Sequence, residues 1–327
     1  MARRSRALAT AFVWLLVLAA LAAWAPTVQA RKGTRPPALA QGNRGADVLA
    51  LQHLLEAQGL QVDTDGVYGP QTTAAVRQVQ RDAGLGTTGE VRDGTWSHLL
   101  ARLEPGARGP AVEALQHQLI HKHGAELSVD GRFGPATGRA VDAFQAHASL
   151  SRDGVVGSGT WTRLLDHYSR LPAQSDVLCA YGDARSVDRE MWGTASAVAQ
   201  LRSAAEGYAA RGGRGRVAVG DLSQEHGGDI PGHATHEQGL DVDIRPMRKD
   251  SRQCTEKTYA SWAAYDRAAT RRFVQEVHRR AEGRVKVIWF NDRQLIREGL
   301  VEPARGHDNH LHIRYCEVGH SDPDYRC

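Results

Sequence analysis

An internal repeat constrains the fold of the first half of this sequence more than any other feature. Gly45-Ala-Asp-Val-Leu-Ala-Leu-Gln52 matches Gly109-Pro-Ala-Val-Glu-Ala-Leu-Gln116, an offset of 64 residues. Three later motifs recur at an offset of 65 residues: Asp65-Gly-Val-Tyr-Gly-Pro70 with Asp130-Gly-Arg-Phe-Gly-Pro135, Ala75–Gln80 with Ala140–Gln145, and Gly94-Thr-Trp96 with Gly159-Thr-Trp161. Self-similarity at a fixed period indicates two copies of one structural unit.

Each copy has the pattern of a small helical bundle. Val48, Leu51 and Leu55 recur at helical spacing and predict a first helix with one apolar face. The Asp-Gly-x-(Tyr/Phe)-Gly-Pro motif predicts a turn, after which Thr72 can cap or begin a second helix. A third short helix follows at Trp96. We therefore expect two three-helix, all-α modules, at residues 38–101 and 102–168.

These repeated motifs resemble the peptidoglycan-binding repeat found in many cell-wall hydrolases. The resemblance occurs twice in register, and it implies that both modules bind peptidoglycan. Most of the shared positions are core and turn residues, so the resemblance predicts the fold of each module and names no wall-contacting residue.

The first thirty residues have the pattern of a secretory signal peptide. A basic start at Arg3, Arg4 and Arg6 precedes an apolar stretch from Ala11 to Trp24 and a small-x-small site ending at Ala30. The alternative is a retained membrane anchor, but the apolar stretch is shorter than the ~20 residues that a spanning helix needs. We expect residues 1–30 to be removed, residues 31–37 to form a linker, and the protein to reach the cell wall or periplasm without stable membrane insertion.

Composition and charge narrow the possible partners. Hydrophobic residues make up 41% and charged residues 24% of the 327 residues, which is ordinary for globular domains. The formal net charge is only +4, with no long basic run, so we do not expect a nucleic-acid partner. We expect a monomer.

Four cysteines lie in the second half of the chain: Cys179, Cys254, Cys316 and Cys327. An even number in an exported chain favours disulfides, and three connectivities are possible. We favour Cys316–Cys327, which closes a short loop, leaving Cys179–Cys254. Cysteine metal ligands would need paired spacing that the sequence lacks.

After a predicted linker at 169–178, residues 179–327 have a different character. Helical patterns occur at 195–210 and 265–282, and strand patterns occur at 216–219, 240–244, 285–290 and 310–315. Without regular alternation of strands and helices, this mixture indicates an α+β domain with a small antiparallel sheet.

Two of the predicted strands carry alternating polar residues suited to metal binding. Asp241 and Asp243 alternate with apolar residues, which predicts a half-buried strand with both carboxylates on one face. His310 and His312 share a face of another strand in the same way. If the two strands are neighbours, these faces converge, and two imidazoles with one carboxylate are a donor set typical of catalytic Zn²⁺.

Four segments together resemble the penicillin-insensitive murein endopeptidases, within the group that includes lysostaphin, D-Ala-D-Ala metallopeptidases and the hedgehog signalling domain. The segments occur in the expected order over roughly residues 215–316: Val219-Gly-Asp-Leu-Ser223, Gly232-His-Ala-Thr-His236, Gly239-Leu-Asp-Val-Asp-Ile244 and His307-Asp-Asn-His310-Leu-His312. The resemblance implies a zinc metallopeptidase that hydrolyses peptide cross-links in peptidoglycan, such as D-Ala–diaminopimelate.

The resemblance also implies residue roles. His236, Asp243 and His312 would be the zinc ligands. His310 would be the catalytic base, and His307 would assist it or stabilise the tetrahedral intermediate. His233 would line the site or add a further ligand. Asp241 would either orient a ligand histidine or be an exposed strand carboxylate.

Three departures from the family pattern bear on specificity. Glu237 stands where the endopeptidases usually carry Gln, and Arg245 where an apolar residue is common. Asn309 occupies the position of the glutamate base of the D-Ala-D-Ala carboxypeptidase branch, which favours an endopeptidase. The alternatives are a zinc carboxypeptidase and a non-catalytic wall-binding protein with a structural zinc. A lysozyme-like glycosidase would need two positioned carboxylates and no metal, and the histidine clusters argue against it.

Overall fold

The computed structural model describes residues 35–172, 174–181, 190–225, 227, 230, 235–317, 320 and 322–327. The predicted signal peptide, most of the predicted linker 31–37 and the predicted site residue His233 lie outside these ranges. Among the residues that are described, no helix is both long enough and apolar enough to cross a membrane.

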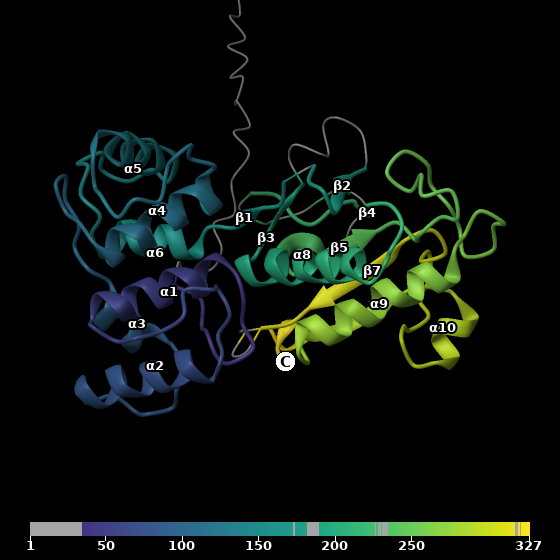
Figure 1. Ribbon diagram of the computed structural model, residues 1–327, viewed down its shortest axis with the longest axis horizontal. Coiled ribbons are helices and arrows are strands. Elements are labelled where there is room, and N and C mark those ends of the chain that lie inside the picture. The colour runs from purple at the N-terminus through teal and green to yellow at the C-terminus, as the bar shows by residue number, and fades with distance from the viewer. Residues whose placement is uncertain are drawn as a thin grey trace, which may run out of the picture.

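Six helices form the two repeats and occupy one side of the molecule (Figure 1). The first repeat contains α1 (Ala46–Ala57), α2 (Pro70–Asp82) and α3 (Asp93–Leu99), and the second contains α4 (Pro110–His123), α5 (Pro135–His147) and α6 (Ser158–Asp166). In each repeat a fully buried tryptophan, Trp96 or Trp161, packs among these helices and donates its indole N–H to a backbone carbonyl. The prediction of two three-helix modules is confirmed.

The repeated glutamine of the first motif explains why the turn motif recurs with it. Gln52 donates from Nε2 to Asp65 Oδ1 at 2.9 Å and accepts from the Gly66 N–H at 2.8 Å. Gln116 makes the equivalent contacts in the second repeat. Helix α2 begins at Pro70, so Thr72 does not begin it; its buried hydroxyl lies 3.3 Å from Gln52 Nε2. The side-chain bonds from α1 therefore hold the turn that starts α2.

The two repeats pack against each other through α1 and α4, and a buried ion pair joins them. Lys122 Nζ on α4 lies 3.0 Å from Asp47 Oδ1 on α1, and both side chains are almost fully buried. Lys122 also donates to the His167 carbonyl at 2.6 Å. Burying an ammonium group is tolerated only when it is paired and hydrogen-bonded, and this one is both.

A five-stranded sheet organises the second half of the chain. Its order is β2 (Leu178–Ala180), β4 (Val217–Val219), β5 (Asp241–Ile244), β7 (Leu311–Tyr315) and β6 (Val285–Trp289). β2 and β4 run parallel, and the other pairs are antiparallel. The predicted α+β class is confirmed, with one parallel pair at the edge of the sheet.

The two faces of this sheet have different roles. Helices α8 (Ala195–Ala210) and α9 (Arg267–Ala281) lie side by side along it (Figure 1). The core that they share with the sheet contains Val242 and Ile244 of β5 and Leu311 and Ile313 of β7. Since side chains alternate along a strand, the intervening residues of β5 and β7 point to the opposite face.

The segment predicted as a linker at 169–178 is partly structured. β1 (Ser169–Arg170) pairs with β3 (Trp192–Gly193) in a second, two-stranded antiparallel sheet. The first repeat also contacts the sheet domain directly, because Arg284 Nη2 donates to the Gln41 carbonyl at 2.5 Å. The repeats are therefore packed on the sheet domain at more than one point.

Two disulfides join the cysteines in the favoured pairing. Cys179–Cys254 ties β2 to the connection between β5 and α9, and Cys316–Cys327 closes the segment after β7. Such cross-links restrict the unfolded chain and so favour the folded state.

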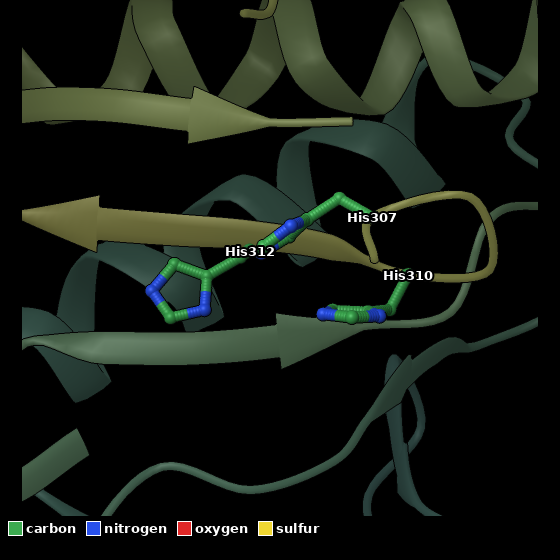
Figure 2. Close-up of side chains that lie close together, drawn as sticks. All are labelled: His307, His310 and His312. Carbon is green, nitrogen blue, oxygen red and sulfur yellow. The ribbon is translucent and has the colours of Figure 1, made fainter. Parts of the chain in front are cut away.

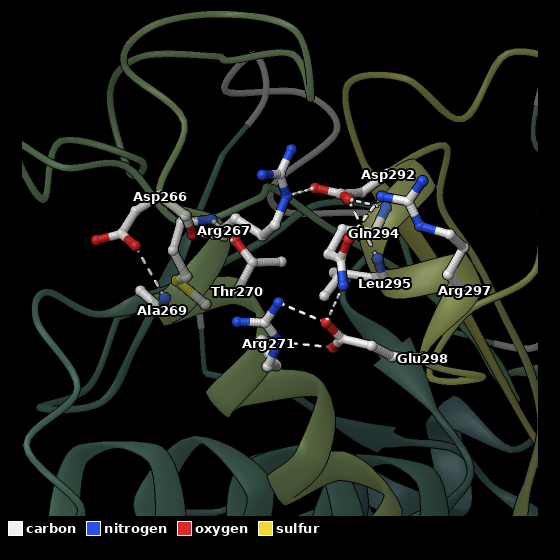
Figure 3. A network of polar contacts seen from close by, with 11 residues as sticks. Asp266, Arg267, Ala269, Thr270, Arg271, Asp292, Gln294, Leu295, Arg297 and Glu298 are labelled. Carbon is white, nitrogen blue, oxygen red and sulfur yellow. Dashed lines mark hydrogen bonds and ion pairs between the residues drawn. The ribbon is translucent and has the colours of Figure 1, made fainter.

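A polar network fixes the short helix α10 (Arg293–Arg297) against α9 (Figure 3). Arg267 Nε donates to Asp292 Oδ2 at 2.7 Å, and Arg271 makes two bonds to Glu298 at 2.6 and 2.7 Å. Asp292 also accepts from the Gln294 N–H at 2.8 Å and so caps α10. The network anchors the segment that leads from β6 toward β7.

We expect the substitution Lys122→Met to lower the free energy of unfolding by about 3 kcal/mol, because it leaves the buried Asp47 carboxylate without its counter-charge. The measurement is urea unfolding followed by tryptophan fluorescence. The double variant Lys122→Met/Asp47→Asn should recover part of the loss, because the second substitution removes the uncompensated charge. A double variant less stable than Lys122→Met would contradict this account of the pair.

Candidate metal centre

The strand register places an aspartate and a histidine side by side. β5 and β7 are antiparallel, with Asp243 directly opposite His312, and Trp289 of β6 is opposite His312 on its other side. Asp243 Oδ1 lies 3.0 Å from His312 Nδ1. The convergence predicted for the polar faces of these two strands is therefore observed for Asp243 and His312. The prediction that His310 shares the strand face of His312 is wrong, because β7 begins at Leu311.

His236 joins this pair from a short helical turn that precedes β5. It lies at the start of η1 (His236–Gln238) and is 1% exposed. Its Nδ1–H donates to the Leu222 carbonyl at 2.6 Å, which leaves Nε2 facing Asp243 Oδ1 at 3.5 Å. One ligand atom from each of His236, Asp243 and His312 can be chosen such that all lie within 4.8 Å of one another.

The prediction of a half-buried strand at β5 is wrong, because both of its faces are covered. Asp241 is 1% exposed and Asp243 is 5% exposed. Asp241 Oδ1 accepts from His312 Nε2 at 2.7 Å and from Arg314 Nε at 2.8 Å. Of the two predicted roles of Asp241, the structure therefore supports the one in which its carboxylate hydrogen-bonds and orients His312. Asp241 is not an exposed strand carboxylate.

The pKa values of Asp243 and His312 are shifted in opposite directions. Desolvation acts to raise the pKa of Asp243, but hydrogen bonds from His236 and His312 outweigh it and hold that pKa far below its usual value. Desolvation acts to lower the pKa of His312, but Asp241 and Asp243 together raise it to about 9. The two aspartates therefore favour a positive charge at His312, and a bound cation could supply that charge in place of a proton.

His310 lies beside the cluster, on the loop that leads into β7 (Figure 2). Its Nε2 lies 3.8 Å from Asp243 Oδ1, and its side chain is 24% exposed. Its Nδ1–H donates to Asn309 Oδ1 at 2.9 Å. Because Nδ1 carries the hydrogen in this arrangement, neutral His310 has its proton-accepting nitrogen on the side of Asp243.

His307 packs against both His310 and His312, with ring centroids 4.7 and 5.6 Å away (Figure 2). Its Nδ1–H donates to the Arg305 carbonyl at 3.0 Å. Desolvation lowers the pKa of His307, and the neutral ring in this tautomer can accept a proton at Nε2 but not donate one.

Asn291 holds the loop that carries His307. Its N–H donates to the His307 carbonyl at 2.8 Å, and its side chain exchanges hydrogen bonds with the backbone of Ala304 at 2.8 and 3.1 Å. Asn291 directly precedes Asp292, the cap of α10. The loop is thus fixed to the same framework as the network of Figure 3.

The structure brings together five of the six predicted site residues, and His233 is the one outside the described ranges. Sequence reasoning missed Trp289, whose ring lies 5.1 Å from that of His312, and Asn291. It also missed the Leu222 carbonyl, since a backbone acceptor carries no sequence signal. The predicted strand at 285–290 contained Trp289, but its pairing with β7 was needed to place it.

The donor set fits a zinc ion. Two imidazole nitrogens and one carboxylate oxygen are typical catalytic zinc ligands, and two ligand atoms of one tetrahedral zinc lie roughly 3.3 Å apart. The separations from Asp243 Oδ1, 3.0 and 3.5 Å, bracket that value. Asp241 on His312 and the Leu222 carbonyl on His236 are the hydrogen-bonding partners that metal-binding histidines usually have.

Comparison with known families identifies three matching regions of the chain. Residues 44–99 and 108–164 each match the peptidoglycan binding domain family, and residues 166–280 match the penicillin-insensitive murein endopeptidase family. The second match includes His236 and Asp243 and ends before His307, so it is shorter at its C-terminal end than the resemblance drawn from the motifs.

Curated relatives match only parts of the chain. A zinc D-Ala-D-Ala carboxypeptidase of Streptomyces albus G is 40% identical over 72 residues, which are 21% of this chain and 27% of that protein. The N-acetylmuramoyl-L-alanine amidase CwlL of Bacillus licheniformis is 29% identical over 160 residues, 38% of this chain and 44% of that protein. The chain thus spans less than half the length of either enzyme. Two peptidoglycan-binding repeats are thus followed by a segment, residues 166–280, that matches the penicillin-insensitive murein endopeptidase family.

Proposed function

We propose that this protein is an exported, zinc-dependent peptidase that hydrolyses stem-peptide cross-links of peptidoglycan, of the D-Ala–diaminopimelate type. One observation carries the proposal: the donor atoms of His236, Asp243 and His312 converge, with His310 Nε2 only 3.8 Å from Asp243 Oδ1. The family matches support the same substrate class.

In this proposal His236 Nε2, Asp243 Oδ1 and His312 Nδ1 hold the zinc ion. Zn²⁺ supplies Lewis acidity, which polarises a substrate carbonyl and lets water lose a proton near neutral pH. The Leu222 carbonyl and Asp241 hold the two histidine rings in the orientation that directs these nitrogens at one point.

His310 acts as the general base. With Nδ1–H bound to Asn309, its Nε2 accepts a proton from the attacking water and passes it to the leaving amine. Of the two roles that the resemblance leaves to His307, we assign the assisting one. Its Nδ1–H is held by the Arg305 carbonyl, so its neutral ring has no hydrogen left to donate to an oxyanion.

The two repeats act by proximity. By holding the chain on peptidoglycan, they raise the local concentration of cross-links around His310 without taking part in the chemistry. Because the repeats pack directly on the sheet domain, this effect does not depend on a long flexible tether.

A zinc D-Ala-D-Ala carboxypeptidase is the second candidate, favoured by the partial likeness to the Streptomyces albus G enzyme. Asn309 argues against it, because the residue standing where that branch has its glutamate base is an amide that orients His310. A wall-binding protein with a purely structural zinc is the third candidate. A structural zinc would not need half-exposed His307 and His310 beside it.

Mass spectrometry of peptidoglycan fragments after incubation with the protein distinguishes these candidates. We expect cross-linked dimers to be split into monomers, and we expect chelator or His312→Ala to abolish the cleavage while wall sedimentation assays still detect binding. Release of free D-Ala without splitting of dimers would favour the carboxypeptidase. Cleavage that persists in the chelated protein would refute zinc catalysis.

We expect His310→Ala to lower kcat by roughly 10²–10⁴-fold, the usual contribution of a general base. Zinc content, measured by atomic emission on the purified protein, should stay at the wild-type level because His310 is not a ligand. His98→Ala, an exposed histidine on α3, is the matched control and should retain full activity. Loss of zinc in the His310 variant would instead make His310 a ligand.

We expect Asp241→Asn to weaken zinc binding by roughly 10–100-fold, because the carboxylate that orients His312 is lost. Competition with a chromogenic chelator measures the affinity. Asp308→Asn, an exposed aspartate on the same loop as His307, is the control and should bind zinc as the wild type does. Equal affinities in the two variants would show that Asp241 does not act on the metal.

A further inference from the structure

A second cluster of metal-ligating side chains lies at the junction of the second repeat and the peptidase domain. His147 ends α5, His167 follows α6, and Glu225 lies in the segment after β4. One ligand atom from each lies within 4.8 Å of the others. None of these residues belongs to the centre formed by His236, Asp243 and His312.

The separations within the cluster are those of ligands around one cation. His147 Nε2 lies 3.2 Å from His167 Nε2, and Glu225 Oε1 lies 3.4 Å from the first nitrogen and 3.7 Å from the second. Ligand atoms of one tetrahedral zinc lie roughly 3.3 Å apart. We propose that His147, His167 and Glu225 form a second zinc-binding site, which joins the second repeat to the peptidase domain.

Direct hydrogen bonding to the carboxylate explains these distances less well. A charge-assisted bond between an imidazolium and a carboxylate is about 2.7–2.9 Å long. The chain contains such a bond, because His312 Nε2 lies 2.7 Å from Asp241 Oδ1. Both distances from Glu225 Oε1 to the imidazole nitrogens exceed the length of such a bond by at least half an ångström. The two imidazole nitrogens that face each other can have only one hydrogen atom between them.

The surroundings also suit a metal. His167 Nδ1–H donates to the Tyr168 carbonyl at 2.8 Å, which is the backbone partner usual for a metal-binding histidine and leaves Nε2 as the donor atom. The His167 side chain is 4% exposed, whereas those of His147 and Glu225 are 27% and 34% exposed. Three protein ligands are the usual number in zinc sites that keep a fourth position for water.

The second site would act on the first through two short connections. Glu225 is three residues after Leu222, whose carbonyl orients His236. On the other side, Tyr168 directly follows His167, and its hydroxyl donates to the Glu237 carbonyl at 3.4 Å, next to His236. Metal at the second site would therefore hold the repeat against the segment that positions a ligand of the first site.

Zinc content of the purified full-length protein tests the proposal. After dialysis against Zn²⁺ and removal of free ion, we expect two zinc ions per wild-type chain. We expect one in each of His147→Gln, Glu225→Gln and His236→Ala, and none in the double variant His147→Gln/His236→Ala. His98→Ala, an exposed histidine outside both clusters, should retain two.

The variants separate this proposal from the proposed function. One zinc in the wild type that is lost in His236→Ala and kept in both His147→Gln and Glu225→Gln would overturn the second site and leave the peptidase intact. One zinc that is lost in His147→Gln and kept in His236→Ala would support the second site and remove the catalytic centre. Glu225→Gln keeps the shape of the side chain, so it tests the site even if His147→Gln fails to fold.

Discussion

The antiparallel pairing of β5 and β7 is the constraint on which the rest of the candidate site depends. It sets Asp243 opposite His312, and the register is held by Val242, Ile244, Leu311 and Ile313, which face the core under α8 and α9. A slip of either strand by one residue would turn its two apolar side chains away from the core and its aspartate or histidine into it. The hydrophobic core therefore determines where the proposed metal ligands meet.

Burying so many ionisable groups is possible because each has a partner. Asp241 accepts hydrogen bonds from His312 and Arg314, and the Arg314 guanidinium lies over the rings of Trp289 and Tyr325, 5.1 and 4.6 Å from their centroids. These contacts offset the loss of hydration and also restrict the side chains to one arrangement. The protein alone thus holds the proposed ligands in one arrangement, which would reduce the reorganisation that metal binding requires.

The repeats and the sheet domain form a continuous structure and are not separated by an open linker. Gly45 of the first repeat approaches Ala195 at the start of α8 so closely that a Cβ would lie 2.4 Å from the Ala195 carbonyl oxygen, and Arg44 pairs with Glu282 at 2.5 Å. Tyr168 carries the contact from the second repeat to the turn at His236. Such packing gives the repeats a defined orientation relative to the candidate metal centre.

Local patterns in the sequence were enough to predict the repeats, the main helices and strands, and the placement of Asp241 and Asp243 on one strand face. Period-two alternation and helical spacing are local properties, so they need no knowledge of the fold. Only the tertiary structure decided that both faces of β5 are buried, that Asp241 stands behind His312, and that Asn309 orients His310. It also brought His147, His167 and Glu225 together from three separate segments. The reason is physical: these contacts join residues far apart in the chain, and their positions follow from how the core packs, which no local pattern encodes.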